Sequence, residues 1–174
     1  GIEELVPAAR TLLVRFRPTV QSFAALVDAI AGRDVRGTAQ RGDMLVEIPV
    51  RYDGEDLADV ATLMDISTEE LITRHTQQQW LAAFGGFAPG FTYCVPAEGD
   101  QTYTWDVPRR SSPRTAVPAG AVGLAGQFSA VYPRTSPGGW QLLGHTELAM
   151  WDVDRDDPAL LIPGRRVRFE AVSA

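Results

Sequence analysis

Lysine is absent from this chain, in which all 16 basic residues among 174 are arginine. The absence excludes from this chain every function that needs a lysine side chain: Schiff-base catalysis, a phosphate-binding P-loop lysine and covalently attached biotin. Any such function must reside on another polypeptide. An arginine-biased genome is the simplest cause, and the exclusion holds whatever the cause.

Cysteine and long apolar runs are also scarce. Cys94 is the single cysteine, which excludes an internal disulfide and a multi-cysteine metal site and fits a reducing compartment. No stretch reaches the roughly 20 apolar residues of a membrane span, and we find no signal-peptide pattern at the start. We therefore expect a cytoplasmic protein with no bound metal and no membrane partner.

Positive charge is in deficit. The net charge is −6 and the pI is near 4.9, whereas binding to nucleic-acid phosphates requires a surplus of cations on one face. The doublets Arg109-Arg110 and Arg165-Arg166 are too short to reverse this. A nucleic-acid partner is not expected, and 45% hydrophobic content fits a globular protein of one or two modest domains.

The first 42 residues predict one strand and one helix. Leu12–Phe16 is rich in strand formers, and apolar residues recur at helical spacing between Phe23 and Ile30. The polar run from Asp34 to Gly42 indicates a linker or loop. We interpret residues 1–42 as a partial N-terminal α+β domain, truncated or unusually short, which must pack on something else because it is too small to hold a core alone.

Residues 43–174 predict a β-rich domain. A strand is expected at Leu45–Val50, followed by two short helices that begin at Asp56 and at Ser67. From Leu81 onward, short apolar runs are cut by glycine and proline about every ten residues, which is typical of a β-sandwich or barrel. The expected strands are Leu81–Phe84, Phe91–Val95, Ala121–Ala125, Ala130–Tyr132, Gln141–Leu143, Leu148–Trp151 and Arg166–Phe169.

Three turns rich in glycine and proline lie in this region: Phe87–Phe91, Val117–Gly120 and Ser136–Trp140. Glycine lets the backbone approach a ligand closely. Each turn also fits an ordinary hairpin beside core aromatic residues, and composition alone favours that reading for Phe87–Phe91. We interpret Ser136–Trp140 as a flexible loop that ends on a tryptophan able to cover a pocket or fill the core.

Together with Pro113-Arg114, these motifs closely resemble the C-terminal domain of the family of allophanate hydrolase subunit 1 and the B-type subunit of 5-oxoprolinase. The resemblance covers roughly Asp43 to Val172. It rests on Gly86–Tyr93, Pro108–Arg110, Pro113-Arg114, Val117–Gly120, Ala125-Gly126, Tyr132-Pro133, Ser136–Trp140, Leu143–Thr146, Tyr52–Leu57 and Thr73–Thr76. It implies a mainly β (α+β) fold, in which residues 43–174 form a cyclophilin-like barrel.

The resemblance also implies that the chain is the small subunit of an enzyme that hydrolyses C–N amide bonds and is active only with a partner. The expected partners are a larger protein, of the type of allophanate hydrolase subunit 2 and the C-type subunit of 5-oxoprolinase, and a third protein of the 5-oxoprolinase A type. ATP would be handled by the full complex, which converts 5-oxoproline to glutamate. The alternatives are a carboxyltransferase subunit for urea or allophanate, a histidine-kinase inhibitor, and a prolyl isomerase, the last suggested by fold alone.

Three residues are candidates for catalysis. His75, on the second predicted helix of 43–174, matches a histidine of the family and could act as a general base or hold a carbonyl, although a locally hydrogen-bonded histidine is at least as plausible. Arg114 could clamp a carboxylate or phosphate bidentately, or form an ion pair across a subunit interface. His145 stands where the family usually has arginine; if that arginine binds an anion, this chain would bind the anion less tightly at neutral pH or use another residue.

The remaining candidates are the glycine-rich turns and their aromatic neighbours. An amide is a poor electrophile, so its hydrolysis needs prior activation and donors for the developing oxyanion, which glycine-rich loops can supply. By contrast, we expect Cys94 to be a small buried hydrophobe. The predicted substrate-binding residues are Phe87, Pro89, Gly90, Phe91, Pro113, Gly138, Gly139, Trp140 and Thr146.

Overall fold

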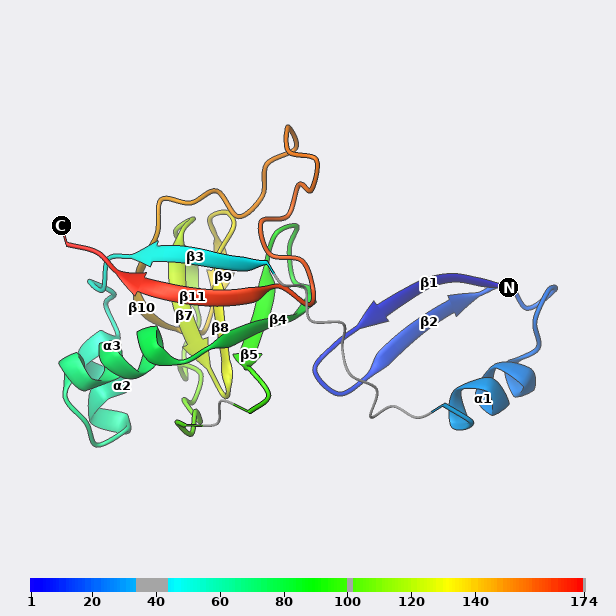
Figure 1. The fold of residues 1–174 in the computed structure, drawn as a ribbon, viewed down its shortest axis with the longest axis horizontal. Helices are drawn as coiled ribbons and strands as arrows, with labels where there is room; N and C mark the ends of the chain where they lie inside the picture. The colour runs from blue at the N-terminus through cyan, green and yellow to red at the C-terminus, as the bar shows by residue number, and fades with distance from the viewer. Residues whose placement is uncertain (34–43, 100–101, 174) are drawn as a thin grey trace. The chain divides into compact units, whose positions relative to one another are not determined.

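The computed structural model describes residues 1–33, 44–99 and 102–173 (Figure 1). The chain divides into two compact units, Gly1–Arg41 and Gly42–Ala174, and each is described by itself. The linker predicted between Asp34 and Gly42 lies outside the described residues.

The first unit is a β-hairpin followed by a helix. Strands β1 (Ile2–Pro7) and β2 (Leu12–Phe16) pair antiparallel, and α1 (Phe23–Ala31) begins after Ser22, whose hydroxyl accepts the backbone N–H of Ala25. The predicted strand and helix are confirmed. Strand β1 was not predicted, because adjacent Glu3 and Glu4 interrupt its apolar pattern.

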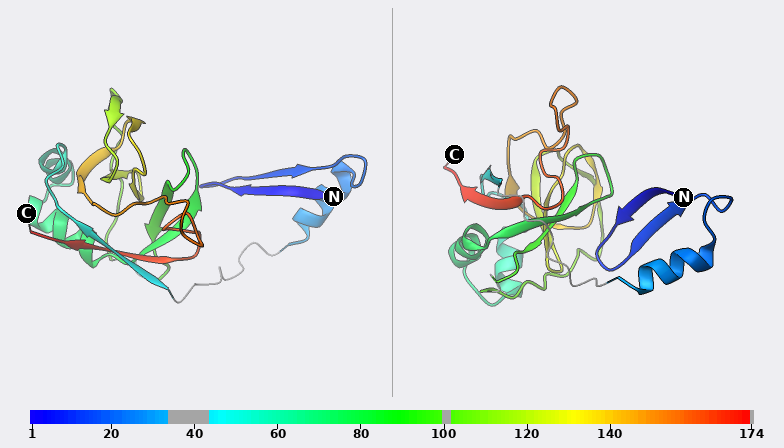
Figure 2. Two further views of the ribbon diagram at one scale, coloured as in Figure 1. Left: turned by 90° about the horizontal axis from the view of Figure 1, so that it is seen from above. Right: turned by 45° about the vertical axis from the view of Figure 1, so that its right-hand side comes forward.

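The second unit is built on a curved sheet of seven strands in the order β10-β7-β8-β5-β4-β11-β3. Its edges meet where Arg51 and His145 exchange two backbone hydrogen bonds of 2.9 Å, which makes the sheet a nearly closed barrel (Figures 1 and 2). The prediction of a mainly β fold is confirmed. The strands are β3 (Leu45–Val50), β4 (Trp80–Gly85), β5 (Thr92–Pro96), β7 (Ala121–Ala125), β8 (Phe128–Val131), β10 (Gln141–His145) and β11 (Arg166–Ala171).

Two further strands, β6 (Arg114–Val117) and β9 (Ser136–Gly138), form a separate antiparallel pair. The prediction of a flexible loop from Ser136 is therefore wrong for its first three residues. The predicted strand Leu148–Trp151 is also wrong, since Trp151 makes only an isolated bridge with Ala159. Its short apolar run lies in a loop that inserts Met150, 1% exposed, into the core.

Two helices pack on the barrel. Helix α2 (Leu57–Leu63) contacts β10, and α3 (Thr68–Gln77) contacts β11. Helix α3 begins after Ser67, whose hydroxyl accepts the backbone N–H of Glu70 at 3.1 Å, as the sequence predicted. None of the helices in the described residues has the length and apolar content to cross a bilayer.

The second unit buries two groups of apolar side chains. The larger fills the barrel between the sheet and the helices and includes Trp80, Leu71, Phe169 and Cys94. Cys94 is 0% exposed, and burial raises the pKa of its thiol to about 12. The prediction of a small buried hydrophobe is confirmed. The smaller group centres on aromatic rings and lies beside the β6–β9 pair: Phe91, Val117, Ala121, Ala125, Ala130, Tyr132, Trp140 and Leu142.

Candidate functional site

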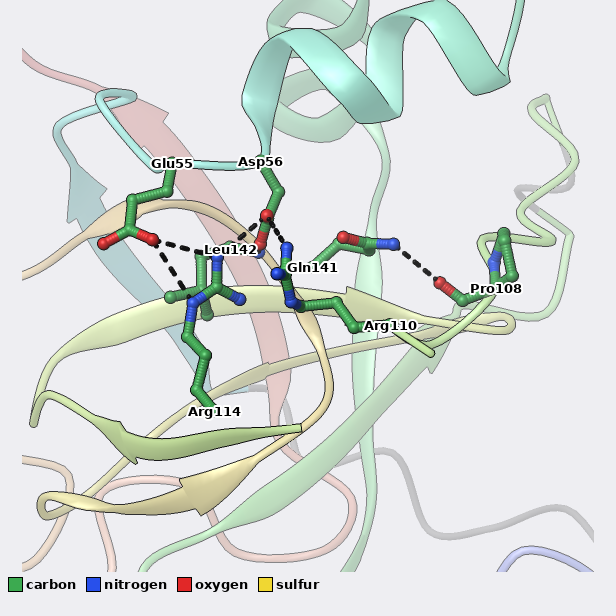
Figure 3. Close-up of polar contacts among 7 residues, drawn as sticks. All are labelled: Glu55, Asp56, Pro108, Arg110, Arg114, Gln141 and Leu142. Carbon is green, nitrogen blue, oxygen red and sulfur yellow. Dashed lines mark hydrogen bonds and ion pairs between the residues drawn. The ribbon is translucent and has the colours of Figure 1, made fainter. Parts of the chain in front are cut away.

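The carboxylate of Asp56, just before α2, joins three separate segments of the barrel (Figure 3). Its Oδ1 atom accepts hydrogen bonds from Nη1 of Arg110 at 2.6 Å and from Nη2 of Arg114 at 2.8 Å. Its Oδ2 atom accepts the backbone N–H of Leu142 in β10 at 2.7 Å. The Asp56 side chain is 2% exposed, so one buried carboxylate fixes the loop before β6, β6 itself and β10.

Charge and hydrogen bonding favour the ionised forms of this group. Burial raises the pKa of Asp56. Hydrogen bonds from Arg114 and Leu142 and the charges of both arginines lower it, and together they outweigh burial, so the pKa of Asp56 lies below its ordinary value. The hydrogen bond to Asp56 raises the pKa of Arg114 against the opposing effect of burial. The site therefore holds a carboxylate and two guanidinium ions at neutral pH.

Glu55 adds a second, much more exposed carboxylate. Its Oε2 atom accepts Nε of Arg114 at 3.3 Å and Nη2 at 3.0 Å. The Glu55 side chain is 77% exposed, whereas that of Arg114 is 15% exposed. Nη1 of Arg114 and Nε of Arg110 are buried and have no hydrogen-bond partner in the described part of the chain. We call Glu55, Asp56, Arg110 and Arg114 the Asp56 cluster.

Two surface hollows adjoin the Asp56 cluster. The Arg110 hollow, of about 480 Å³, is lined by Asp59, Thr62, Leu63, Pro108, Arg109, Arg110, Ser111 and Gln141. The Glu55 hollow, of about 260 Å³, is lined by Asp53, Gly54, Glu55, Pro118, Ala121, Leu142, Gly144 and His145. Gln141 donates its side-chain amide to the carbonyl of Pro108 at 3.0 Å and so ties the loop of the first hollow to β10 (Figure 3).

Four of the predicted site residues, Pro113, Arg114, Gly138 and Gly139, meet at the β6–β9 pair. Arg114 pairs with Gly138 across the ladder, Pro113 lies beside Gly139, and the carbonyl of Gly139 accepts the backbone N–H of Arg110 at 2.8 Å. A Cβ on Gly138 would lie 2.3 Å from the hydroxyl oxygen of Tyr132. Gly138 thus makes room for a packed aromatic side chain.

The predicted aromatic residues lie mostly in the smaller core. Phe91 is 2% and Trp140 is 4% exposed, and their ring centroids lie 5.5 Å apart. Trp140 therefore fills the core, although Arg109 lies over its ring at 6.0 Å. Phe87 alone among them is 59% exposed, and its backbone has a positive φ of 67°.

Pro89 and Gly90 do not join the Asp56 cluster. Pro89 lines a different hollow, of about 300 Å³, with Pro133, Arg134 and Trp151. Gly90 has a φ of +81°, and a Cβ there would lie 2.8 Å from the Cβ of Trp151. The turn that carries both residues is consequently set by backbone conformation and by contact with Trp151.

His145 lies at the rim of the Glu55 hollow. Its Nδ1 atom is 2.9 Å from Oδ1 of Asp53, and its Nε2 atom is 3.6 Å from Oε1 of Glu147. The neighbouring Thr146 is 5% exposed and donates its backbone N–H to Gly120 at 2.9 Å. His145 is thus accessible and carboxylate-paired near the Asp56 cluster, whereas Thr146 serves the backbone packing beside it.

His75 lies in the larger core, away from these groups. It is 0% exposed, with Nδ1 2.7 Å from the hydroxyl of Tyr52 and Nε2 2.9 Å from the hydroxyl of Ser129. Its ring stacks on Phe169 with centroids 4.4 Å apart, and burial lowers its pKa to about 3. A neutral imidazole with both nitrogens occupied cannot reach a substrate while the core is closed, which favours a structural role.

Sequence reasoning missed the residue at the centre of the site. Asp56 was interpreted as the start of a helix and as a member of the family motif Tyr52–Leu57, without a role in the site, and its side chain makes no capping hydrogen bond. Arg110 was noted in a basic doublet and in the family motif Pro108–Arg110, also without a role in the site. Within the described residues, no group of three or more His, Cys, Asp or Glu side chains is arranged to hold a metal ion.

The chain is similar to a family of carboxyltransferase domains and to B subunits of 5-oxoprolinase. Residues 1–161 match the family model described as "Carboxyltransferase domain, subdomain C and D". The chain is 46% identical over 127 residues to the 5-oxoprolinase B subunit of Escherichia coli O157:H7, covering 71% of this chain and 56% of that protein. It is 38% identical over 159 residues to the 5-oxoprolinase B subunit of Haemophilus influenzae, covering 90% of this chain and 70% of that protein.

Solved structures share the fold. The structure of the protein TTHA0988 matches with a TM-score of 0.79 and 37% identity, covering all of this chain and 33% of that one. The urea amidolyase of Kluyveromyces lactis matches with a TM-score of 0.75 and 21% identity, covering 99% of this chain and 12% of that one. The chain therefore has the cyclophilin-like carboxyltransferase fold, and it spans about half the length of the first curated relatives that it matches.

Proposed function

Because the chain belongs to the carboxyltransferase-domain family, subdomains C and D, together with proteins named as the B subunit of 5-oxoprolinase, we propose that it is the B-type subunit of such an enzyme. The observation that carries the proposal is the 38–46% identity to three bacterial proteins of that name. The reaction is the ATP-dependent hydrolysis of the lactam of 5-oxoproline, which yields glutamate.

The chemistry of the substrate fits the Asp56 cluster. 5-Oxoproline carries a carboxylate beside an unreactive amide, and a guanidinium binds a carboxylate through two parallel hydrogen bonds. Arg114 already directs Nε and Nη2 at a carboxylate, because both atoms donate to the single oxygen Oε2 of Glu55, and the same two donors can meet both oxygens of a substrate carboxylate. We therefore give Arg114 the role of binding the substrate, with Arg110 beside it, and assign no proton transfer to the buried His75.

Activation of the lactam must come from elsewhere in the enzyme. An amide becomes a competent electrophile when its oxygen is phosphorylated, and ATP supplies that phosphoryl group. This chain has no lysine with which to hold the triphosphate. We propose that proteins of the 5-oxoprolinase A and C types complete the enzyme in the cytoplasm, that they handle ATP, and that this chain alone is inactive.

The test is reconstitution. The chain is co-expressed with the A-type and C-type proteins from the same source, and glutamate release from 5-oxoproline is measured with and without ATP. Release only with ATP and all three proteins is the expected result. Urea and allophanate serve as parallel substrates, since the fold is shared with a urea amidolyase.

Two results would contradict the proposal. Turnover of urea or allophanate instead of 5-oxoproline would make the chain a carboxyltransferase component of urea breakdown. A stable complex of all three proteins without turnover of any of the substrates would favour a regulatory binding protein, such as a histidine-kinase inhibitor.

A further inference from the structure

We propose that Arg114 is the centre of an oxyanion-binding site in which Glu55 is a built-in competitor: a ligand carboxylate or phosphate binds by displacing the Glu55 side chain. The inference deepens the function proposed above and rests on it for the identity of the ligand. The existence of the site rests on the geometry of the Asp56 cluster alone.

The first argument is the balance of charge in the Asp56 cluster. The Oδ1 atom of Asp56 accepts two guanidinium hydrogen bonds, at 2.6 and 2.8 Å, and its Oδ2 atom accepts a backbone N–H at 2.7 Å. Asp56 supplies one negative charge against the two positive charges of Arg110 and Arg114. The second counter-charge is the exposed Glu55.

The second argument is the difference in exposure within the Glu55–Arg114 pair. The Arg114 side chain is 15% exposed and is held in place by Asp56, whereas the Glu55 side chain is 77% exposed. Ion pairs with an exposed partner contribute about 0–1 kcal/mol, because water and salt screen them and a long side chain loses freedom. Glu55 can therefore leave Arg114 at little cost, while the guanidinium stays in position.

The third argument is the unused donor capacity of the two arginines. Nη1 of Arg114 and Nε of Arg110 are buried and lack a partner among the described residues. A buried N–H without an acceptor is unfavourable. An oxyanion that replaces Glu55 brings at least two acceptor oxygens to Arg114, where Glu55 uses Oε2 alone.

A hollow lies beside Glu55. Glu55 lines the space of about 260 Å³ that it shares with His145, whereas Arg114 does not line it while Glu55 is in place. The proposal therefore requires that movement of Glu55 opens Arg114 to this side. The ligand class is a small molecule with a carboxylate or phosphate group. The carboxylate of 5-oxoproline and a phosphoryl group derived from ATP are its two sources under the proposed function.

The experiment is a titration of the full chain labelled with ¹⁵N, in which the arginine Nε–Hε signals are followed by NMR. Acetate, inorganic phosphate and 5-oxoproline are the probes. The variant Arg114→Lys identifies the Arg114 signal by its loss. It keeps the positive charge beside Asp56, so the barrel retains its counter-ion, but it removes the planar pair of donors.

Glu55→Gln should bind the responding probe about two- to fivefold more tightly than the natural chain, as expected from the loss of an exposed competing ion pair. Arg114→Lys should bind about tenfold more weakly, because the bidentate contact is lost. Glu47→Gln is the matched control, since it removes the same charge from the exposed pair with Arg168 and should leave the affinity unchanged.

Unchanged affinity in Glu55→Gln, or equal tightening in Glu47→Gln, would overturn the proposal. A response to acetate and 5-oxoproline but not to phosphate identifies a carboxylate site, and the reverse identifies a phosphate site. Glutamate release by the reconstituted enzyme is measured separately. Tight anion binding at Arg114 without glutamate release would refute the proposed function and support the oxyanion site. Glutamate release without anion binding at Arg114 would support the proposed function and refute the oxyanion site.

Discussion

Replacing Asp56 with asparagine removes the one buried charge that joins α2, the loop before β6, β6 and β10. The amide oxygen of the new side chain can still accept the N–H of Leu142, but its NH₂ group then faces Arg110 and Arg114 and repels their donors. Two charge-assisted hydrogen bonds, of 2.6 and 2.8 Å, are lost. Breaking a buried ion pair by removing one partner costs about 3–5 kcal/mol. Arg110 is 34% exposed, so we expect the lower end, about 3 kcal/mol.

Urea unfolding followed by tryptophan fluorescence measures the loss of unfolding free energy in the unit that contains Asp56. All four tryptophans, Trp80, Trp105, Trp140 and Trp151, lie in the unit Gly42–Ala174, so the signal does not report on the first unit. With a slope of about 2 kcal/mol/M, a loss of about 3 kcal/mol lowers the midpoint by about 1.5 M urea. Asp156→Asn, at an exposed loop position, should change stability by less than about 0.5 kcal/mol.

The pH dependence provides a second check. The pKa of Asp56 is depressed in the folded state, so its contribution is fully present above the unfolded value of about 3.9 and is lost as pH falls through the folded pKa. The difference between the natural chain and Asp56→Asn should therefore shrink below about pH 4. A midpoint for Asp56→Asn within about 0.3 M of the natural chain at pH 7, by the same slope, would refute the claim that this carboxylate holds the barrel segments together.

Two further predictions concern the barrel itself. Burial lowers the pKa of His75 to about 3, so the free energy of unfolding should fall as the pH drops below about 6.5, with a slope that approaches about 1.4 kcal/mol per pH unit. Urea unfolding at several pH values measures this slope. The slope should disappear in His75→Gln and persist in His145→Gln. Gly144→Ala places a Cβ 2.1 Å from the carbonyl oxygen of Arg51, where the sheet closes, whereas the nearest atom at Gly85 is 3.8 Å away. We expect a loss of about 3 kcal/mol or more for Gly144→Ala and little change for Gly85→Ala, and equal midpoints in urea for the two variants would contradict the close contact.

Local patterns in the sequence were sufficient for most of the fold. The strands of the barrel follow from short apolar runs bounded by turn signals, and the cap at Ser67 follows from a capping motif. Each of these signals spans only a few neighbouring positions. The strands β6 and β9 escaped detection because they are only four and three residues long, and β9 consists of serine, proline and glycine, which are typical of turns. Leu148–Trp151 gave the opposite error, since its apolar run belongs to a loop that packs Met150 and Leu148 against the core.

The centre of the site could not be predicted in the same way. Asp56 contacts Arg110, Arg114 and Leu142, which lie 54, 58 and 86 positions further along the chain. No periodicity or spacing rule links residues at such separations. Resemblance drew attention to Arg114 and His145, which do lie at the Asp56 cluster or the hollow beside it, and also to His75, which lies inside the core. A family motif marks residues that the fold needs as readily as residues that contact a ligand.

Residues that the fold needs and residues that bind a ligand can be told apart by experiment. Substituting the first kind should lower stability, whereas substituting the second kind should lower ligand binding alone. Trp140 and Gly138 are fixed by packing against Phe91 and Tyr132, so Trp140→Ala should lower stability by about 3–5 kcal/mol and lower any activity in proportion. Arg114→Lys keeps the charge beside Asp56 and should weaken anion binding while leaving the urea midpoint nearly unchanged. If Arg114→Lys instead lost stability and binding together, as Trp140→Ala should, then Arg114 would be part of the scaffold, and the oxyanion would have to bind elsewhere.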